Sequence, residues 1–246
     1  MSPFKKTNIA VVLVEPENPD NIGSTARAMK NMGFLDLRLV RPPSNWKKKG
    51  RKLAMSAVDQ LEKAQVYQTL EEAICDMTLV VGTTRRRRKK WQNFKDFHVA
   101  ISGIVRKASK CRVAILFGKE SKGLDNAALD LCDWGISIPT SSAYPSINLA
   151  QAVMIIVFSL SGGAWDQGEG GEDFLLPYVS KKEFHEALER FKSSLYALGY
   201  EREGNDTLER IVATFHGILK RSGLIHSEAQ MIKGLSRRIQ EKVSTL

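Results

Sequence analysis

Cysteine is scarce in this chain of 246 residues, and its arrangement excludes two common kinds of site. The three cysteines, Cys75, Cys111 and Cys132, show no Cys-x-x-Cys spacing. A scattered, odd set of cysteines indicates neither a disulfide framework nor a zinc site. The four histidines are equally dispersed, whereas the ligands of a metal ion cluster. We therefore expect no bound metal.

Long apolar runs are also missing. The first run, "IAVVLV" at residues 9–14, has six residues, too few for the core of a signal peptide, and no small-residue cleavage site follows it. The run around "AVMIIVFSL" is far shorter than the ~20 residues that a membrane-spanning helix needs. We expect a cytoplasmic protein that does not associate with a membrane.

Two familiar nucleotide-binding motifs are absent as well. The stretch "LFGKESKGL" at residues 116–124 contains glycines, but it lacks the spacing and the closing Lys-Ser/Thr pair of a Walker A loop. The sequence also contains no Gly-x-Gly-x-x-Gly fingerprint. Nucleotide hydrolysis and hydride transfer therefore have no support in the sequence.

Positive charge, by contrast, is abundant and unevenly placed. The formal net charge is +10, of which residues 1–165 carry +11 and residues 166–246 carry −1. A basic domain of this size attracts polyanions, and nucleic acid first among them. Solubility alone would not require so uneven a distribution.

Strand and helix patterns alternate along the basic part of the chain. Apolar strand patterns occupy residues 8–14, 35–40, 77–83, 112–118 and 134–139. Helical patterns fall between them, at residues 22–32, 69–76, 96–108, 124–131 and 147–160. This alternation predicts an α/β fold, with a mostly parallel sheet, helices on both faces and a ligand crevice at the carboxyl ends of the strands.

The pattern changes after residue 163, which we take as the end of the first domain. Residues 164–177 are rich in glycine and acidic side chains, as a linker is. In residues 178–246, helical patterns recur at 181–198, 206–221 and 228–244, and Ser227 and Gln230 are placed as a capping box. A helical extension of this size is marginally stable alone, so we expect it to contact the first domain, another subunit or RNA.

Two basic segments carry much of the charge. Residues 80–90, "VVGTTRRRRKK", leave a strand and present six consecutive cations, with Trp91 next to them. Cations beside aromatic side chains suit phosphates beside unstacked bases. Residues 47–52, "KKKGRK", lie next to Trp46 and are predicted to be a second basic loop. The alternative interpretation is a solvated, partly disordered loop.

Three polar stretches lie where strands give way to helices. "DNIGSTARAMKNMGF" predicts a helix over residues 21–33 with Arg27 one turn from its buried stripe. "LFGKESKGL" places Glu120 between two glycines, and "IPTSSAYPSINLAQAVMII" opens an apolar helix at Ser146. The plain interpretations are a solvated arginine, an ordinary turn and an N-cap serine. The functional interpretation is that exposed amides and small polar side chains line a ligand pocket.

Taken together, these stretches resemble a known set of motifs. The patterns are "NxGxxAR" at Asn21–Arg27, "FGxExxGL" at Phe117–Leu124 and "SINLAQAV" at Ser146–Val153. They resemble the three motifs of the SPOUT class of RNA methyltransferases, and most closely its SpoU branch. The resemblance covers roughly residues 8–160. The stretches "LVEPENPDNIG" and "VVGTTRR", with a helical tail behind them, are similar to the tRNA 2′-O-methyltransferases of that branch.

The resemblance implies a SPOUT fold, in which the carboxyl-terminal segment of the domain forms a trefoil knot. It also implies a homodimer, S-adenosyl-L-methionine as cofactor and methyl transfer to a ribose 2′-hydroxyl of RNA, above all in the tRNA anticodon loop, with no role for DNA. The family's cofactor positions match Thr83, Thr84, Gly118, Ile138, Ser146, Ile147, Asn148 and Leu149. Its catalytic positions match Asn21, Arg27, Glu120 and Ser146.

Arg27 is the residue with the most specific hypothesis. An arginine keeps its proton at neutral pH, so Arg27 is unsuited to be the general base. Its planar donors suit a phosphate or alkoxide of the target ribose. The expected RNA contacts are Arg27, Arg85, Arg86 and Arg88. Three alternatives stay open: an RNA-binding module without catalysis, a methyltransferase for ribosomal RNA, and a small-molecule enzyme.

Overall fold

The computed structural model describes residues 4–85, 93–162, 177–200 and 206–244. The chain forms two compact units, residues 1–173 and 174–246. The predicted linker covers residues 164–177, and of these residues 164–176 lie outside the described ones.

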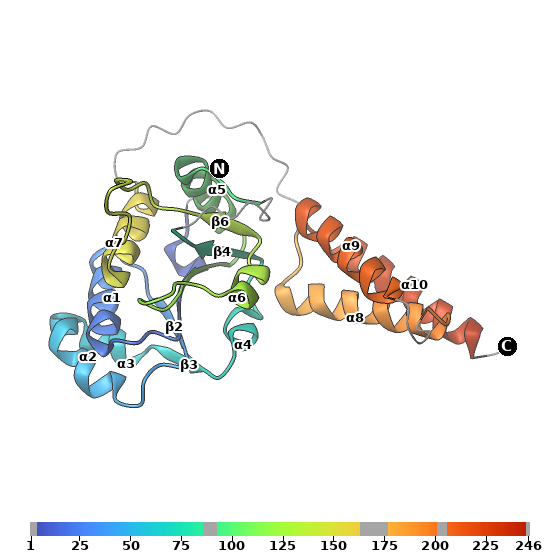
Figure 1. The fold of residues 1–246 in the computed structure, drawn as a ribbon, viewed down its shortest axis with the longest axis horizontal. Coiled ribbons are helices and arrows are strands. Elements are labelled where there is room, and N and C mark those ends of the chain that lie inside the picture. The colour runs from blue at the N-terminus through green and yellow to red at the C-terminus, as the bar shows by residue number, and fades with distance from the viewer. Residues whose placement is uncertain (1–3, 86–92, 163–176, 201–205, 245–246) are drawn as a thin grey trace. The chain divides into compact units, whose positions relative to one another are not determined.

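The first unit is built on a six-stranded sheet (Figure 1). The strands are β1 (Ile9–Val14), β2 (Asp36–Val40), β3 (Gln65–Tyr67), β4 (Leu79–Thr83), β5 (Val113–Phe117) and β6 (Trp134–Ile136). They lie in the order β3-β2-β1-β5-β4-β6, and every pair is parallel. This arrangement confirms the predicted α/β fold. The short strand β3 was not predicted, because its largely exposed residues carry no buried strand pattern.

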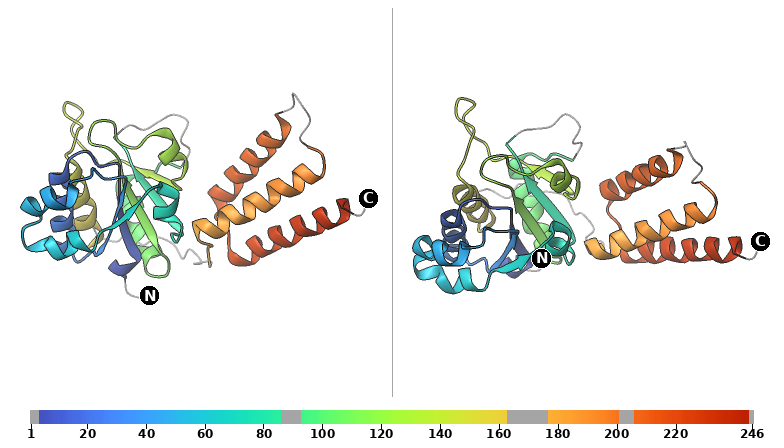
Figure 2. Two further views of the ribbon diagram at one scale, coloured as in Figure 1. Left: turned by 90° about the horizontal axis from the view of Figure 1, so that it is seen from below. Right: turned by 60° about the horizontal axis from the view of Figure 1, so that its bottom comes forward.

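Helices cover both faces of the sheet, as expected, and Figure 2 shows the sheet between the two layers. One core cluster joins alternate residues of β1, such as Val11, to α1 (Pro19–Asn31), α5 (Phe97–Ala108) and α7 (Leu149–Leu160). The other joins Val12 to the short helices on the opposite face, α4 (Leu70–Ile74) and α6 (Asn126–Asp130). Neighbouring residues of β1 thus enter different clusters, as the two-residue period of a strand requires.

Residues 46–54 form a helix, α2 (Trp46–Ala54), where we predicted a basic loop. Trp46, Gly50 and Ala54 recur every fourth residue and are buried against the core, while the cations between them are exposed. Such a spacing is that of an amphipathic helix. The prediction was wrong because it was based on the consecutive cations and overlooked these three regularly spaced apolar residues. The turn η2 (Met55–Ala57) and helix α3 (Val58–Glu62), also unpredicted, follow.

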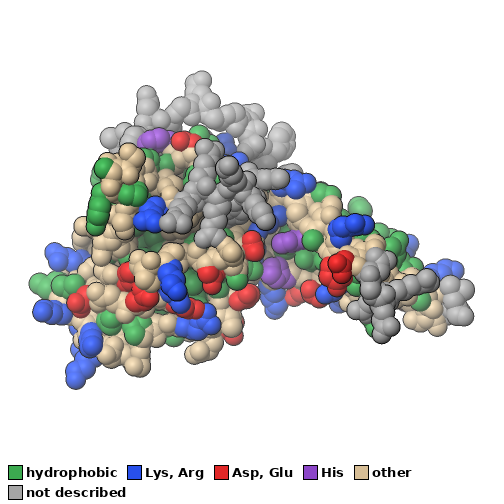
Figure 3. Space-filling view, in the orientation of Figure 1, with side chains coloured by type: hydrophobic (Ala, Val, Ile, Leu, Met, Phe, Trp, Pro, Cys, Tyr) green, Lys and Arg blue, Asp and Glu red, His purple; other side chains and the backbone are tan. Residues whose placement is uncertain are grey.

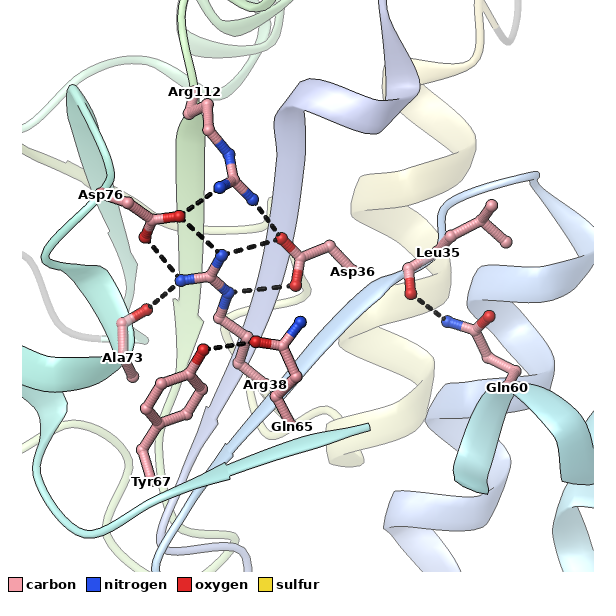
Figure 4. A network of polar contacts seen from close by, with 9 residues as sticks. All are labelled: Leu35, Asp36, Arg38, Gln60, Gln65, Tyr67, Ala73, Asp76 and Arg112. Carbon is pink, nitrogen blue, oxygen red and sulfur yellow. Dashed lines mark hydrogen bonds and ion pairs between the residues drawn. The ribbon is translucent and has the colours of Figure 1, made fainter. Parts of the chain in front are cut away.

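A network of charges joins the amino-terminal ends of three strands (Figure 4). Arg38 on β2 is 3% exposed and donates hydrogen bonds to Asp36 at 3.0 Å and to Asp76 at 2.7 and 3.0 Å. Arg112, just before β5, contacts the same two carboxylates. The charges are therefore paired and hydrogen-bonded, as burial demands.

Asp76→Asn is expected to lower the free energy of unfolding by roughly 1–2 kcal/mol at neutral pH, a value reduced for the partial exposure of Asp76. Burial acts to raise the pKa of Asp76, but the hydrogen bonds and charges of Arg38 and Arg112 outweigh it and lower the pKa. The contribution is therefore complete above about pH 4 and is lost as the pH falls through the lowered folded-state value.

Urea unfolding of the wild type and the variant between about pH 7 and pH 3 measures this contribution. The difference in stability should stay constant down to about pH 5 and shrink below pH 4. A difference that stayed constant over the whole range would contradict the assignment.

The second unit consists of α8 (Lys181–Ala197), α9 (Thr207–Ser222) and α10 (His226–Val243). Its small core joins the three helices: Val179, Phe184, Ala187, Leu219, Leu224 and Ala229. The predicted capping box at Ser227 and Gln230 is wrong, because α10 already begins at His226. The carboxylate of Glu228 instead accepts a hydrogen bond from the backbone N–H of Ile225 at 3.1 Å.

Candidate functional site

The carboxyl ends of β4, β5 and β6 surround a pocket of about 430 Å³. Three segments form its wall: residues 83–85, residues 117–124 and parts of residues 137–152. The volume suits a small-molecule ligand, for which pockets range over about 300–1,000 Å³. The cofactor residues expected from the sequence that line this pocket are Thr83, Thr84, Gly118, Ile138, Ser146, Ile147 and Leu149.

Two glycines shape the segment after β5. A Cβ atom on Gly118 would lie 2.1 Å from both the carbonyl carbon of Gly123 and the backbone nitrogen of Leu124. Gly123 has a φ of +71°, in the left-handed region, and its N–H donates to the carbonyl of Lys119 at 2.7 Å. The loop therefore folds back on itself, and backbone atoms form this part of the pocket wall.

Two carboxylates join this loop to the residues before α1. Glu120 accepts hydrogen bonds from the backbone N–H groups of Glu17 at 2.8 Å and Asn18 at 3.1 Å, and from Nδ2 of Asn21 at 2.8 Å. The carboxylate of Glu17 in turn accepts from the backbone N–H and Oγ of Ser121, at 3.0 and 2.8 Å. These bonds from Ser121 lower the pKa of Glu17. We call this arrangement the Glu17–Glu120 clasp; in it, Glu120 positions Asn21.

Asn148 extends the clasp to α7. Its Oδ1 accepts hydrogen bonds from the backbone N–H groups of Ala150 at 2.9 Å and Gln151 at 3.4 Å, and its Nδ2 donates to Oδ1 of Asn21 at 2.9 Å. Asn148 is therefore the N-cap of α7. The interpretation of Ser146 as the cap is wrong, because α7 begins only at Leu149 and Ser146 lies in the pocket wall.

Arg27 lies in a second hollow, of about 560 Å³. Asn148 lines this hollow, whereas Ile147 and Leu149 on either side of it line the first pocket, so the two cavities adjoin at the start of α7. The second hollow is lined by Asn21, Ser24, Arg27, Ala28, Asn31, Leu53, Asn148, Ala150, Gln151 and Met154. Arg27 is exposed, and its side chain forms no hydrogen bond or ion pair with any residue that the structure describes, so the guanidinium donors face solvent.

The structure also locates part of the basic segment. Arg85 lines the first pocket, and Arg86 and Arg88 lie outside the described residues. Sequence reasoning missed Glu17 and Ser121, which are 104 positions apart. No local spacing signals that contact. Helix α1 also begins two residues earlier than predicted, because the side chain of Asn18 accepts a hydrogen bond from the N–H of Asp20 and caps it at Pro19.

Glu120→Gln is expected to lower kcat/KM by about tenfold to a hundredfold, because an amide must turn an N–H toward at least one of the three donors that the carboxylate now accepts. Steady-state kinetics with the RNA and cofactor that the family resemblance implies measure the change. Glu71→Gln, at an exposed carboxylate on α4, is the matched control and should change kcat/KM by less than about twofold. Equal activity of both variants would show that the clasp does not support the site.

The described residues also show two absences. No three His, Cys, Asp or Glu side chains gather there as metal ligands would. None of the helices in the described ranges combines the length and the apolar character of a membrane span.

Comparison with known proteins gives a consistent result. A sequence model of the SpoU rRNA methylase family matches residues 8–158. The tRNA (cytidine/uridine-2′-O-)-methyltransferase TrmJ of Yersinia pestis is 33% identical over 219 residues, covering 89% of this chain and 77% of the relative. TrmJ of Salmonella choleraesuis is 30% identical over 240 residues, covering 96% and 97%. The crystal structure of TrmJ from Z. mobilis ZM4 has a TM-score of 0.77 and 28% identity, with coverage of 94% and 98%.

Proposed function

Because the chain belongs to the SpoU rRNA methylase family, we propose that it transfers a methyl group from S-adenosyl-L-methionine to a ribose 2′-hydroxyl of tRNA. The names of the TrmJ relatives, which match most of the chain, support tRNA as the substrate. One observation carries the proposal: the pocket lined by the second and third motifs adjoins the hollow that holds Arg27.

The first pocket fits the cofactor. At Gly118 the wall has no side chain, because a Cβ there would lie 2.1 Å from the backbone of Gly123 and Leu124. The loop therefore presents backbone groups to the pocket. Peptide groups and the hydroxyls of Thr84 and Ser146 offer hydrogen-bonding partners to the polar groups of a nucleoside. When bound, S-adenosyl-L-methionine supplies a methyl group activated on a sulfonium sulfur.

Arg27 contributes orientation and charge. Its guanidinium holds a phosphate beside the target ribose and stabilises the negative charge that develops on the 2′-oxygen. The N-terminal part of α1 is held by Glu120, and Asn21 is bound to Asn148 at 2.9 Å. These contacts fix the helix that carries Arg27 relative to the cofactor pocket, so Asn21, Glu120 and Asn148 are positioning residues. Ser146 faces the ligand as part of the pocket wall.

The proposal extends to finer features that the family resemblance implies. They are a trefoil knot formed by the carboxyl-terminal segment of the domain, a homodimer, the anticodon loop as target, and a cytoplasmic location. The proposed RNA contacts of the basic segment are Arg85, Arg86 and Arg88. The proposed domains are a methyltransferase domain at residues 1–163, a linker at 164–177 and a helical extension at 178–246. Light scattering that showed a monomer at micromolar concentration would contradict the dimer.

Incubation with labelled cofactor and bulk RNA, followed by mass spectrometry of nucleosides, tests the proposal. We expect label in 2′-O-methylated cytidine or uridine from tRNA. Label in ribosomal RNA alone would favour an rRNA methyltransferase, the candidate that the family's description supports. No label, together with no thermal shift by the cofactor, would favour an RNA-binding module without catalysis.

A further inference from the structure

We propose that helix α2 is a docking surface for the RNA backbone, with Lys49 and Lys52 as the phosphate contacts. This inference rests on the proposed function, since it assumes that the RNA reaches Arg27. It concerns the basic segment at residues 47–52, which lies away from the cofactor pocket.

The helical spacing places the two lysines beside the Arg27 hollow. Leu53 lines that hollow together with Arg27. Lys49 lies four residues before Leu53 and three before Lys52, so these side chains share one flank of α2. Lys47 and Arg51 lie on the other flank, where Lys47 stands 5.4 Å from the ring centroid of Trp46 and Arg51 pairs with Glu62 of α3.

The two lysines are exposed, and the side chain of neither forms an ion pair or hydrogen bond with another residue in the described ranges. Two like charges one helical turn apart repel each other, and a phosphate between them relieves this repulsion. Lys and Arg side chains project from the end of the unit where α2 lies (Figure 3). The surface is therefore cationic where the RNA would leave the Arg27 hollow.

Close helix packing fixes this surface relative to Arg27. A Cβ on Gly23 of α1 would lie 2.0 Å from the carbonyl oxygen of Gly50 of α2, so the two backbones touch. Because neither helix can shift alone, the lysines and Arg27 form one preorganised set of cations, which lowers the entropic cost of binding a polyanion.

The test compares two double variants of equal charge. Lys49→Gln with Lys52→Gln removes the proposed contacts. Lys5→Gln with Lys110→Gln is the control, since both residues are exposed and precede β1 and β5, at the amino-terminal ends of the strands and away from the site at their carboxyl ends. Filter binding of bulk tRNA over a range of salt concentrations should show about tenfold weaker binding for the first variant only. Its plot of log affinity against log salt should lose about one unit of slope for each lysine.

Binding of S-adenosyl-L-methionine and the thermal unfolding temperature should be unchanged in both variants. Equal affinities and slopes in the two variants would overturn the inference. Weaker binding accompanied by dissociation of the dimer in light scattering would also overturn it, because α2 would then be a subunit contact. Failure of the proposed function gives a different result: the wild type itself would transfer no methyl group to tRNA.

Discussion

Replacing Arg27 with alanine is expected to reduce methyl transfer to tRNA by about a hundredfold to a thousandfold, the range found when one donor to a developing oxyanion is removed. Arg27 lines the second hollow and no part of the cofactor pocket. The dissociation constant of S-adenosyl-L-methionine should therefore change by less than about twofold. Single-turnover kinetics and calorimetry measure the two quantities separately.

Lys30→Ala is the matched control for Arg27→Ala. Lys30 lies one turn further along α1, but its side chain forms an ion pair with Asp59 and does not line the hollow. The control should keep methyl transfer within about threefold of the wild type. The role of Arg27 would be refuted if its alanine variant kept most of the activity or lost cofactor binding outright.

The second large effect is expected for Gly118→Ala, which should weaken cofactor binding by at least about a hundredfold. The added methyl group would lie 2.1 Å from two backbone atoms, which cannot swing aside as a flexible side chain can. The loop must therefore open, and Glu120 and Ser121, which follow Gly118 in it, shift with it. A displacement of this kind removes several hydrogen bonds at once, each contributing about 1 kcal/mol or more. Isothermal titration with S-adenosyl-L-methionine measures the loss.

Gly123→Ala, in the same loop, separates collision from backbone strain. Gly123 has a φ of +71°, but a Cβ there would meet nothing within 4 Å. Its replacement introduces about 1 kcal/mol of strain and no collision, so affinity should fall by about fivefold. Cofactor binding by Gly118→Ala as tight as that of the wild type would show that the loop does not line the binding site.

Most of the sheet could be predicted because three of its central strands, β1, β4 and β5, carry apolar runs. Such runs in β1, β4 and β5 follow from burial on both faces, a local signal that survives in any sequence of this fold class. By contrast, α2 is defined by Trp46, Gly50 and Ala54 alone, and its charges dominate the composition. Three apolar residues can be recognised as the buried face of a helix only when the partner helix α1 is known.

The site could be predicted as a set of motifs, but its internal contacts could not. Ser146 and Asn148 are both residue types that begin helices, and local preference does not separate them. The choice is made by Asn21, which is 127 positions from Asn148 along the chain and accepts a hydrogen bond from it. The partnership of Glu17 with Ser121 is equally distant in sequence. These contacts depend on how the parallel strands bring their ends together.

Asn148 has a consequence for how this chain can vary. An asparagine carries its acceptor and its donor on separate atoms, and here the acceptor starts α7 while the donor reaches Asn21. An aspartate at this position would still start the helix, yet it would set a negative oxygen against the oxygen of Asn21. Asn→Asp, a conservative substitution at most helix N-caps, is therefore expected to be poorly tolerated at position 148. We expect proteins that descend from this gene to keep an amide at position 148 for as long as the start of α7 remains hydrogen-bonded to Asn21 of α1.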